Sequence, residues 1–203
     1  MPCQIPDNHI VWQGLVWCEP MTVATDGLLA VLCLVLLTRH VGLSRGFFGL
    51  ASAAFALGGL RHLVLAEWPE LVAMLSRASN TTSSLSLALL LLILLPWGAR
   101  GRAVIAAGSA AVIVGHVWLD HFLLSVLHSA VTFITILIVA LSSGQRGDFR
   151  WFYAAFVLAL LAGLVFGLRL TPTFFFNHND LAHVLLMGAY VALHRQLSVT
   201  SAA

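Results

Sequence analysis

Charged residues are scarce in this chain of 203 residues, and lysine is absent altogether. Asp, Glu, Lys and Arg make up 9% of the sequence, against about 25% in soluble domains. A retinal Schiff base requires a lysine amine, so the missing lysine excludes a rhodopsin. The formal net charge of +2 offers no basic surface for nucleic acid. Basic residues that are all arginine are typical of a high-GC genome and favour a bacterial source.

Cysteine is also rare, and the three cysteines follow no metal-binding spacing. Cys33 lies within an apolar run, and we expect it to pack in the membrane interior. Cys3 and Cys18 are able to form a disulfide if their end of the chain lies outside the cytoplasm, and the spacing leaves that pairing open. Residues 1–19 lack the basic start and apolar core of a cleavable signal peptide.

Hydrophobic residues make up 60% of the sequence, which has a mean hydropathy of +0.97. A membrane-spanning helix needs about 20 mainly apolar residues. The sequence therefore predicts an all-α polytopic membrane protein with one seven-helix transmembrane domain over 1–203, in which 1–21 form a short extracytoplasmic segment. Residues 67–80 are also able to form a short interfacial helix. The expected spans are 22–38, 46–66, 80–96, 103–118, 122–141, 152–169 and 179–195.

Two features of the sequence set the direction of these spans. A single helix over 103–141 would be about 58 Å long, too long for one crossing, so we expect a tight turn near Asp120. The first, third and fifth connections and the C-terminus hold seven arginines, whereas the opposite side holds three. The positive-inside rule then predicts an outer N-terminus and a cytoplasmic C-terminus, in a bacterial inner membrane.

This topology gathers most of the polar residues at the outer ends of the helices, and little except arginine at the inner ends. Ionisable groups at membrane depth are costly and usually mark function. The other interpretation is that they are hydrated helix ends, which suits Asp26 and Asp120 better than His62 and His183. The outer layer contains Asp26, His62, the stretch SNTTSS, His116, Asp120, His121, His178, Asp180 and His183, with His128 lying deeper.

The segment FFFNHNDLAHVLL at the start of the last span is the most informative motif. Asn177 and Asp180 are spaced as in a capping box, which leaves two histidines unexplained. Asn179 and Asp180 share a helical face with His183, whereas His178 fits only if it precedes the helix or the first turn is irregular. Elsewhere, His116 and Asp120 are four residues apart, which fits either a second shell around a metal or an ordinary polar turn.

The seven spans, the histidine near the outer end of the second and the HND..H motif opening the seventh resemble the alkaline ceramidase and progestin/adiponectin receptor superfamily of membrane hydrolases. The resemblance extends to a bacterial branch with a similar HND..H segment. It implies a zinc ion bound by His62, His183 and a third ligand, for which His178 is the candidate because Asn179 occupies the other histidine position of the family motif; Asn179 itself is the alternative ligand. A serine of the family is replaced by Gly58.

The resemblance implies a ceramidase-like hydrolase that cleaves a lipid amide or ester taken from the outer leaflet. Asp180 or Asp120 would serve as the catalytic base, and His116, His121, Asn179 and Asp26 would support the metal ligands. The sequence around WCE (residues 17–19) is similar to the family's calcium region. Calcium is doubtful here, because the side chains of Val16, Met21 and Ala30 offer no oxygen ligand.

Two other classes of function fit the same composition. Several of the histidines would be available as axial ligands of b-type haem, although most lie near one end of the bundle rather than at matched depths. A non-catalytic receptor or transporter is the third class, and transport would be favoured by broken helices at the midplane, which the sequence does not predict.

Overall fold

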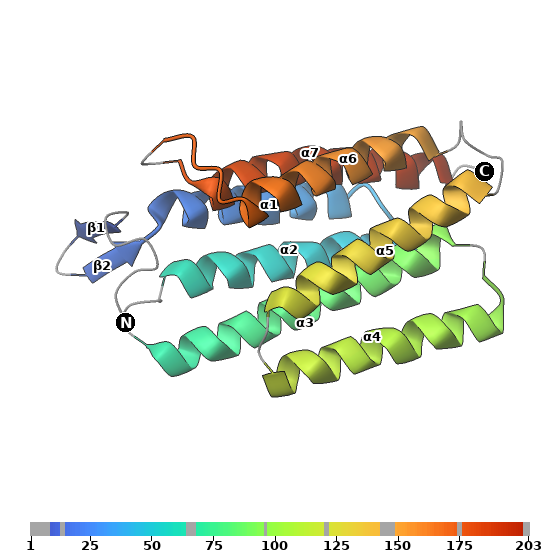
Figure 1. Ribbon diagram of the computed structural model, residues 1–203, viewed down its shortest axis with the longest axis horizontal. Coiled ribbons are helices and arrows are strands. Elements are labelled where there is room, and N and C mark those ends of the chain that lie inside the picture. The colour runs from blue at the N-terminus through green and yellow to red at the C-terminus, as the bar shows by residue number, and fades with distance from the viewer. Residues whose placement is uncertain are drawn as a thin grey trace.

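The computed structural model describes residues 9–12, 15–63, 68–95, 97–119, 122–142, 149–173 and 176–200, with side chains described from Glu19 onwards. A short antiparallel hairpin precedes seven helices (Figure 1). The hairpin, which the sequence analysis did not anticipate, pairs His9 with Cys18 and Trp12 with Leu15. The elements are β1 (His9–Trp12), β2 (Leu15–Cys18), α1 (Pro20–Leu37), α2 (Gly42–Leu63), α3 (Pro69–Leu94), α4 (Ala99–Leu119), α5 (Phe122–Ser142), α6 (Arg150–Gly167) and α7 (His178–Thr200).

The helices form one bundle in which chain neighbours run alongside one another (Figure 1). The most extensive packing joins α1 to α2, α2 to α3 and α6 to α7, and α7 also packs on α1. The N-terminal end of α7 therefore lies beside the N-terminal end of α1, next to the hairpin. This arrangement brings residues about 160 positions apart in the chain into contact, as the Asn179–Glu19 hydrogen bond shows.

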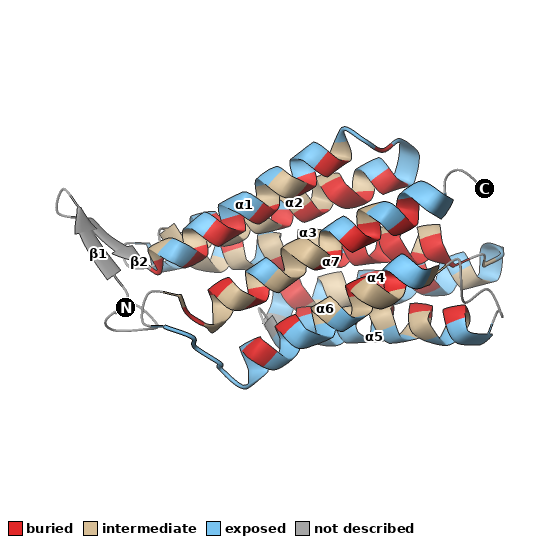
Figure 2. Cartoon of the chain, turned by 90° about the horizontal axis from the view of Figure 1, so that it is seen from above, coloured by how far each residue is buried: buried red, intermediate tan, exposed pale blue. Residues whose placement is uncertain are grey.

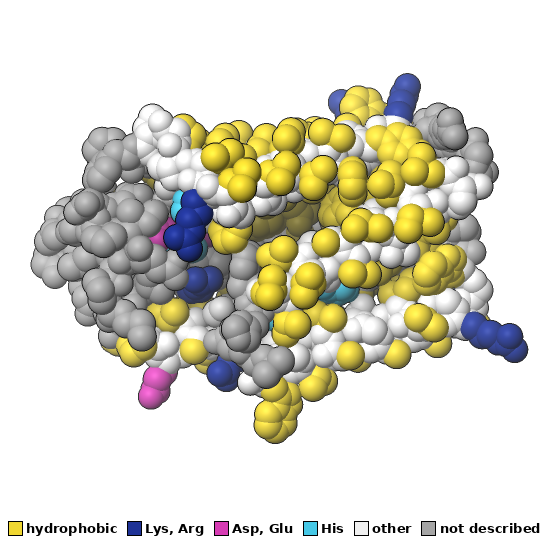
Figure 3. Space-filling view, viewed as in Figure 1, with side chains coloured by type: hydrophobic (Ala, Val, Ile, Leu, Met, Phe, Trp, Pro, Cys, Tyr) yellow, Lys and Arg dark blue, Asp and Glu magenta, His cyan; other side chains and the backbone are white. Residues whose placement is uncertain are grey.

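Six helices, α1 to α6, are long and apolar enough to cross a membrane. Hydrophobic side chains cover the face seen in Figure 3, and arginines lie towards its two ends. Buried residues follow the inward faces of the helices (Figure 2). The largest core cluster, which includes Phe47, Phe48, Leu90, Phe152 and Leu197, packs the half of the bundle away from the hairpin. A chain of this kind is suited to a bilayer, since its exposed surface is apolar between polar ends.

The third helix differs from expectation, because it begins at Pro69 rather than near residue 80. Proline fits the first turn of a helix, where its missing N–H is not needed. The hydroxyl-rich stretch after Arg77 is tolerated within the helix because its side chains bond to carbonyls. Ser79 donates to the Ala54 carbonyl of α2 at 2.8 Å, and Ser86 donates to Ser83 of its own helix at 2.8 Å.

The break expected between the fourth and fifth spans is present, since α4 ends at Leu119 and α5 begins at Phe122. Asp120 and His121 themselves lie outside the described residues, as does Cys3, so their predicted roles stay predictions. The expectation that the far end of the bundle holds little except arginine is wrong. There, His40 and His194 form a direct hydrogen bond of 2.8 Å between Nε2 and Nδ1, and His40 stacks on Phe48.

Candidate functional site

The first turn of α7 is held by the reciprocal cap expected from the spacing of Asn177 and Asp180. The backbone N–H of Asn177 donates to Asp180 Oδ2 at 2.8 Å. In return, Asn177 Oδ1 accepts the backbone N–H groups of Asn179 at 2.7 Å and Asp180 at 3.3 Å. Because these bonds satisfy N–H groups that a helix start leaves open, the sequence fixes both the position and the rotamer of the Asp180 carboxylate.

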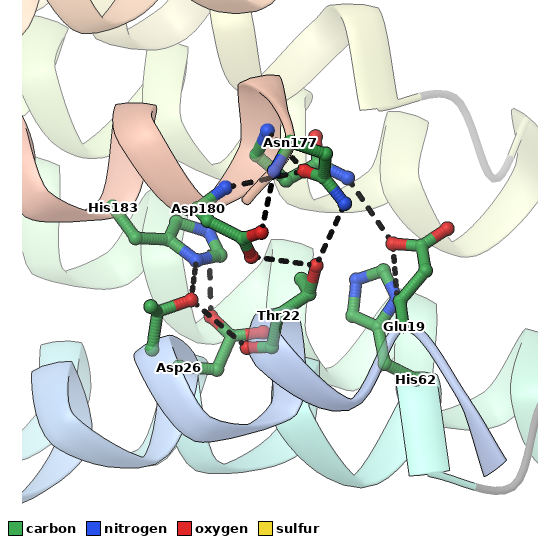
Figure 4. Close-up of polar contacts among 9 residues, drawn as sticks. Glu19, Thr22, Asp26, His62, Asn177, Asp180 and His183 are labelled. Atoms are coloured by element: carbon green, nitrogen blue, oxygen red, sulfur yellow. Dashed lines mark hydrogen bonds and ion pairs between the residues drawn. The ribbon is translucent and has the colours of Figure 1, made fainter. Parts of the chain in front are cut away.

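Asp180 also ties α7 to α1 through Thr22 (Figure 4). The Thr22 hydroxyl donates to Asp180 Oδ1 at 2.9 Å and accepts the Asn177 side-chain amide at 3.4 Å. Thr22 and Asp180 are 0% exposed, and Asn177 is 1% exposed. Both oxygens of this carboxylate thus accept hydrogen bonds from the protein itself, and Asp180 links α7 to α1.

One turn further along α7, the imidazole of His183 bridges two side chains of α1. Its Nδ1 lies 3.0 Å from Thr25 Oγ1, and its Nε2 lies 3.5 Å from Asp26 Oδ1. The single hydroxyl proton of Thr25 is donated to the Thr22 carbonyl at 3.1 Å. If that proton stays directed at the Thr22 carbonyl, the Thr25 oxygen accepts from His183 Nδ1 and Nε2 faces Asp26 with its lone pair. If Thr25 donates to Nδ1 instead, Nε2 carries its proton towards Asp26.

A second histidine–carboxylate pair lies beside the first, where α2 ends and α1 begins. His62 Nδ1 is 3.5 Å from Glu19 Oε2, and both side chains are almost fully buried. The same Glu19 oxygen accepts the Asn179 amide at 3.2 Å. Burial raises the pKa of the Glu19 carboxyl above its usual 4.5, although the bond from Asn179 opposes this shift. His62 Nδ1 and Glu19 Oε1 are both buried without a hydrogen-bond partner.

Two consecutive glycines of α2 make room for Asp26. A Cβ added at Gly59 would meet the Asp26 Cβ at 3.2 Å, and one added at Gly58 would meet Asp26 Oδ2 at 3.4 Å. The glycines therefore allow α1 and α2 to approach closely, and the Asp26 carboxylate fills the space on the helix surface of α2. Asp26 is 4% exposed.

The structure brings together five of the residues predicted from sequence: Asp26, His62, Asn179, Asp180 and His183. His178 is turned elsewhere, with its ring 5.8 Å from that of Phe166 on α6. His116 joins a different polar network, in which its Nε2 lies 2.9 Å from Ser84 Oγ. Both assignments of function to these two histidines stay predictions.

Sequence reasoning missed Glu19, Thr22 and Thr25 as members of the site. Glu19 was considered only as part of the WCE resemblance, and its left-handed backbone (φ 49) just before Pro20 turns it to where α1, α2 and α7 meet. One sequence pattern indicates the two threonines. Thr22, Thr25 and Asp26 follow helical spacing and form one polar face on an otherwise apolar helix.

Three buried carboxylates and two imidazoles thus meet at one end of an apolar helical bundle. No three His, Cys, Asp or Glu side chains, among those described, are close enough together to hold a metal ion. The fold and this cluster define an all-helical bundle, with six of the described helices apolar enough to cross a membrane and a histidine–carboxylate cluster at one end. The chain belongs to the family of unknown function DUF6962, whose model matches residues 21–199. No curated protein and no solved structure matches the chain.

Proposed function

We propose that this protein is a zinc-dependent membrane hydrolase that cleaves a lipid amide or ester at the cluster formed by α1, α2 and α7. The observation that carries the proposal is the pairing of His183 Nε2 with Asp26. His183 Nε2 lies 3.5 Å from Asp26 Oδ1, and both side chains are largely buried. A zinc ion held by this imidazole would place the Asp26 carboxylate next to the metal-bound water.

The donor set of the cluster also fits zinc. His62 Nδ1 and Glu19 Oε1 are buried polar atoms without a partner, a costly condition that a bound cation would relieve. Imidazole nitrogen and carboxylate oxygen are both common zinc ligands. His62 and His183 would bind the metal, with Glu19 as the carboxylate ligand, which leaves the fourth position open for water. Glu19 would thus take the place of the third family histidine, for which His178 was the expected residue.

When bound, zinc would lower the pKa of a coordinated water to about 7 and polarise a scissile carbonyl. The chain's own residues would prepare that chemistry. The contact of 3.0 Å between Thr25 Oγ1 and His183 Nδ1 would hold the ring with Nε2 available to the metal. Asp180, already fixed by Thr22 and the helix cap, would keep α7 in register against α1 rather than serve as the base. The base of the reaction is then a carboxylate on α1, Asp26.

The lipid nature of the substrate follows from the surroundings of the cluster. Hydrophobic side chains cover the bundle beside the polar end, and Figure 3 shows a hollow among them between α5 and α6, with acidic, histidine and arginine side chains at its polar end. An acyl chain would fit such a surface, and the amide or ester would lie at the polar end. By the positive-inside rule, this end faces the outer leaflet of the bacterial inner membrane.

Metal analysis of the purified protein tests the proposal. Wild type should contain about one zinc per chain, and His62→Ala and His183→Ala should each lose most of it. His178→Ala decides between the two ligand sets, because it should keep its zinc if Glu19 completes the site. His194→Ala, at the far end of the bundle, is the matched control. Equal zinc in all five proteins, or none in wild type, would refute the metal site.

Activity is measured separately on a fluorescent N-acyl lipid and its ester analogue in mixed micelles. Wild type should hydrolyse one of them, and a zinc chelator should abolish the reaction, with recovery after zinc is restored. Asp26→Asn should lose activity by about 100-fold or more while keeping its zinc. A zinc-loaded wild type that cleaves neither lipid would leave the metal site intact and reject the hydrolase.

A further inference from the structure

A second polar cluster lies between α3, α4 and α5, apart from the site on α1, α2 and α7. His116 Nε2 of α4 lies 2.9 Å from Ser84 Oγ of α3 and 3.3 Å from Ser125 Oγ of α5. Ser125 donates in turn to Asn80 Oδ1 at 3.2 Å. All four side chains are buried. Hydrogen bonds between membrane helices commonly hold helices together, and these four residues need no further explanation.

Two neighbouring side chains of α5 are not explained in this way. His128 is 8% exposed and Thr132 is 0% exposed, yet neither His128 Nδ1 nor Thr132 Oγ1 has a hydrogen-bond partner among the described residues. Together with Ser125 they follow the spacing i, i+3, i+7, so all three lie on one face of α5. An unsatisfied polar group in an apolar interior is destabilising. A ligand with hydrogen-bonding groups on this face of α5 would satisfy both atoms.

The polar cluster ends blindly within the bundle. From Ser125 to Thr132 it extends about 10 Å along α5, at about 1.5 Å per residue. The next inward-facing residue of this helix, Ile136, is 0% exposed and belongs to the main hydrophobic core together with Ile105 of α4 and Leu91 of α3. A polar column that stops at an apolar floor suits a binding site rather than a pathway across the membrane.

The chemistry of the six side chains selects a neutral ligand. They supply hydroxyl, amide and imidazole groups, which both donate and accept hydrogen bonds, and include no carboxylate or guanidinium that would balance a charged ligand. The outer surfaces of α4 and α5 are apolar, with Val114, Trp118, Leu127 and Val131 exposed. Figure 3 shows a histidine side chain through the gap between these two helices. The approach to the cluster is therefore through lipid.

We propose that α3, α4 and α5 bind the neutral, hydroxyl-bearing headgroup of a glycerolipid such as diacylglycerol, with His128 and Thr132 as its hydrogen-bond partners. The headgroup hydroxyl donates to one of these atoms and accepts from the other, so both buried groups are satisfied. The acyl chains remain on the apolar surface of α4 and α5. α4 packs much less on α5 than on α3. The headgroup would therefore enter between α4 and α5. The site does not depend on hydrolysis at the first cluster.

The experiment uses a photoactivatable diacylglycerol added to the full chain in phosphatidylcholine nanodiscs, with crosslinked peptides mapped by mass spectrometry. Wild type should show saturable labelling of α4 and α5. Thr132→Val removes one hydrogen bond without changing the shape, and should weaken binding about fivefold, which corresponds to about 1 kcal/mol. The matched control is Thr135→Val. Its hydroxyl already bonds to Val131 O of the same helix at 2.7 Å, so labelling should not change.

Stability and competition decide the remaining outcomes. Without added lipid, Thr132→Val should melt at the same or a higher temperature, because an unsatisfied hydroxyl is lost. A clear drop in melting temperature would mean that the hydroxyl is bonded inside the protein, and the proposal fails. It also fails if labelling is equal in wild type and Thr132→Val. Dioleoylglycerol should compete with the probe, whereas phosphatidylglycerol and free glycerol should not. Competition by glycerol alone would identify a free polyol instead of a lipid.

Discussion

The hydrogen bond from Thr22 of α1 to Asp180 of α7 leads to a specific prediction for stability. Asp180→Ala would leave two buried donors without an acceptor, the Thr22 hydroxyl and the Asn177 backbone N–H, which now bond at 2.9 and 2.8 Å. Each unsatisfied buried donor costs about 1–3 kcal/mol. The substitution should therefore lower the free energy of unfolding by about 2–6 kcal/mol. Asp180→Asn keeps one acceptor for the N–H and should cost about 1–2 kcal/mol.

Unfolding is followed in detergent by the reaction of Cys33 with a fluorogenic maleimide. Cys33 is 0% exposed and becomes reactive only when the bundle opens. A Cys3→Ser, Cys18→Ser background confines the signal to this one thiol. A double-mutant cycle with Thr22→Ala should give a coupling energy of about 1–3 kcal/mol, since the two side chains share one bond. Thr38→Ala is the control, because its hydroxyl bonds only within its own helix end.

One result would refute this reasoning. If Asp180→Ala is as stable as the background protein, the cost of burying the carboxylate equals or exceeds the benefit of its bonds. A coupling energy near zero, with a destabilised Asp180→Ala, would mean that the residue acts through the helix cap alone. In that case Thr22 does not link the two helices.

Three further predictions concern packing, capping and pH. Gly59→Ala should destabilise the α1–α2 contact, because the new Cβ meets the Asp26 Cβ at 3.2 Å. Gly27→Ala, which meets no atom within 4 Å, should instead stabilise its helix by up to about 1 kcal/mol. Thermal unfolding of the two variants beside wild type measures both effects. Gln196→Leu should cost about 1–3 kcal/mol in the same assay, since it removes the acceptor of the buried Phe152 N–H at 3.1 Å, and an unchanged melting temperature would contradict this. Burial, with a smaller effect from the adjacent imidazole, lowers the pKa of His40 below its usual 6.5. The unfolded chain then binds more protons, so stability should fall as the pH drops below about 6.5, and His40→Gln should flatten that part of the profile.

Sequence patterns were sufficient for the bundle but not for its details. Long apolar runs and the arginine-rich connections predicted seven membrane-spanning helices. The described residues form seven helices, and six of them, α1 to α6, are long and apolar enough to cross a membrane. The start of α3 was predicted too late, because the polar stretch SNTTSS is typical of a helix boundary. Inside the helix, Ser79 is satisfied by a hydrogen bond to the Ala54 carbonyl of α2, and local sequence patterns do not reveal such a contact. The β1–β2 hairpin was missed because two strands of four residues carry too little periodic signal.

The candidate site was predictable only in part, and the reason is physical. Asn177 and Asp180 form a local cap, so their spacing in the sequence was enough to predict their contact. Glu19 is placed by a left-handed turn and by the packing of three helices, and no periodicity reports such a contact. His116 lies at the same end of the bundle as His62, yet its helix packs on α3 and α5 and carries it to another cluster. A shared layer does not imply a shared site.

The glycine at position 58 and the carboxylate at position 26 are best understood together. A side chain at position 58 would begin 3.4 Å from Asp26 Oδ2, so a serine at this point would compete with the Asp26 carboxylate for the same space. Gly58 on α2 thus leaves room for the Asp26 carboxylate of α1. Asn179 follows the same logic, because it donates to Glu19 instead of offering an imidazole. At positions 58 and 179 the residue present therefore accommodates an acidic side chain from the start of α1.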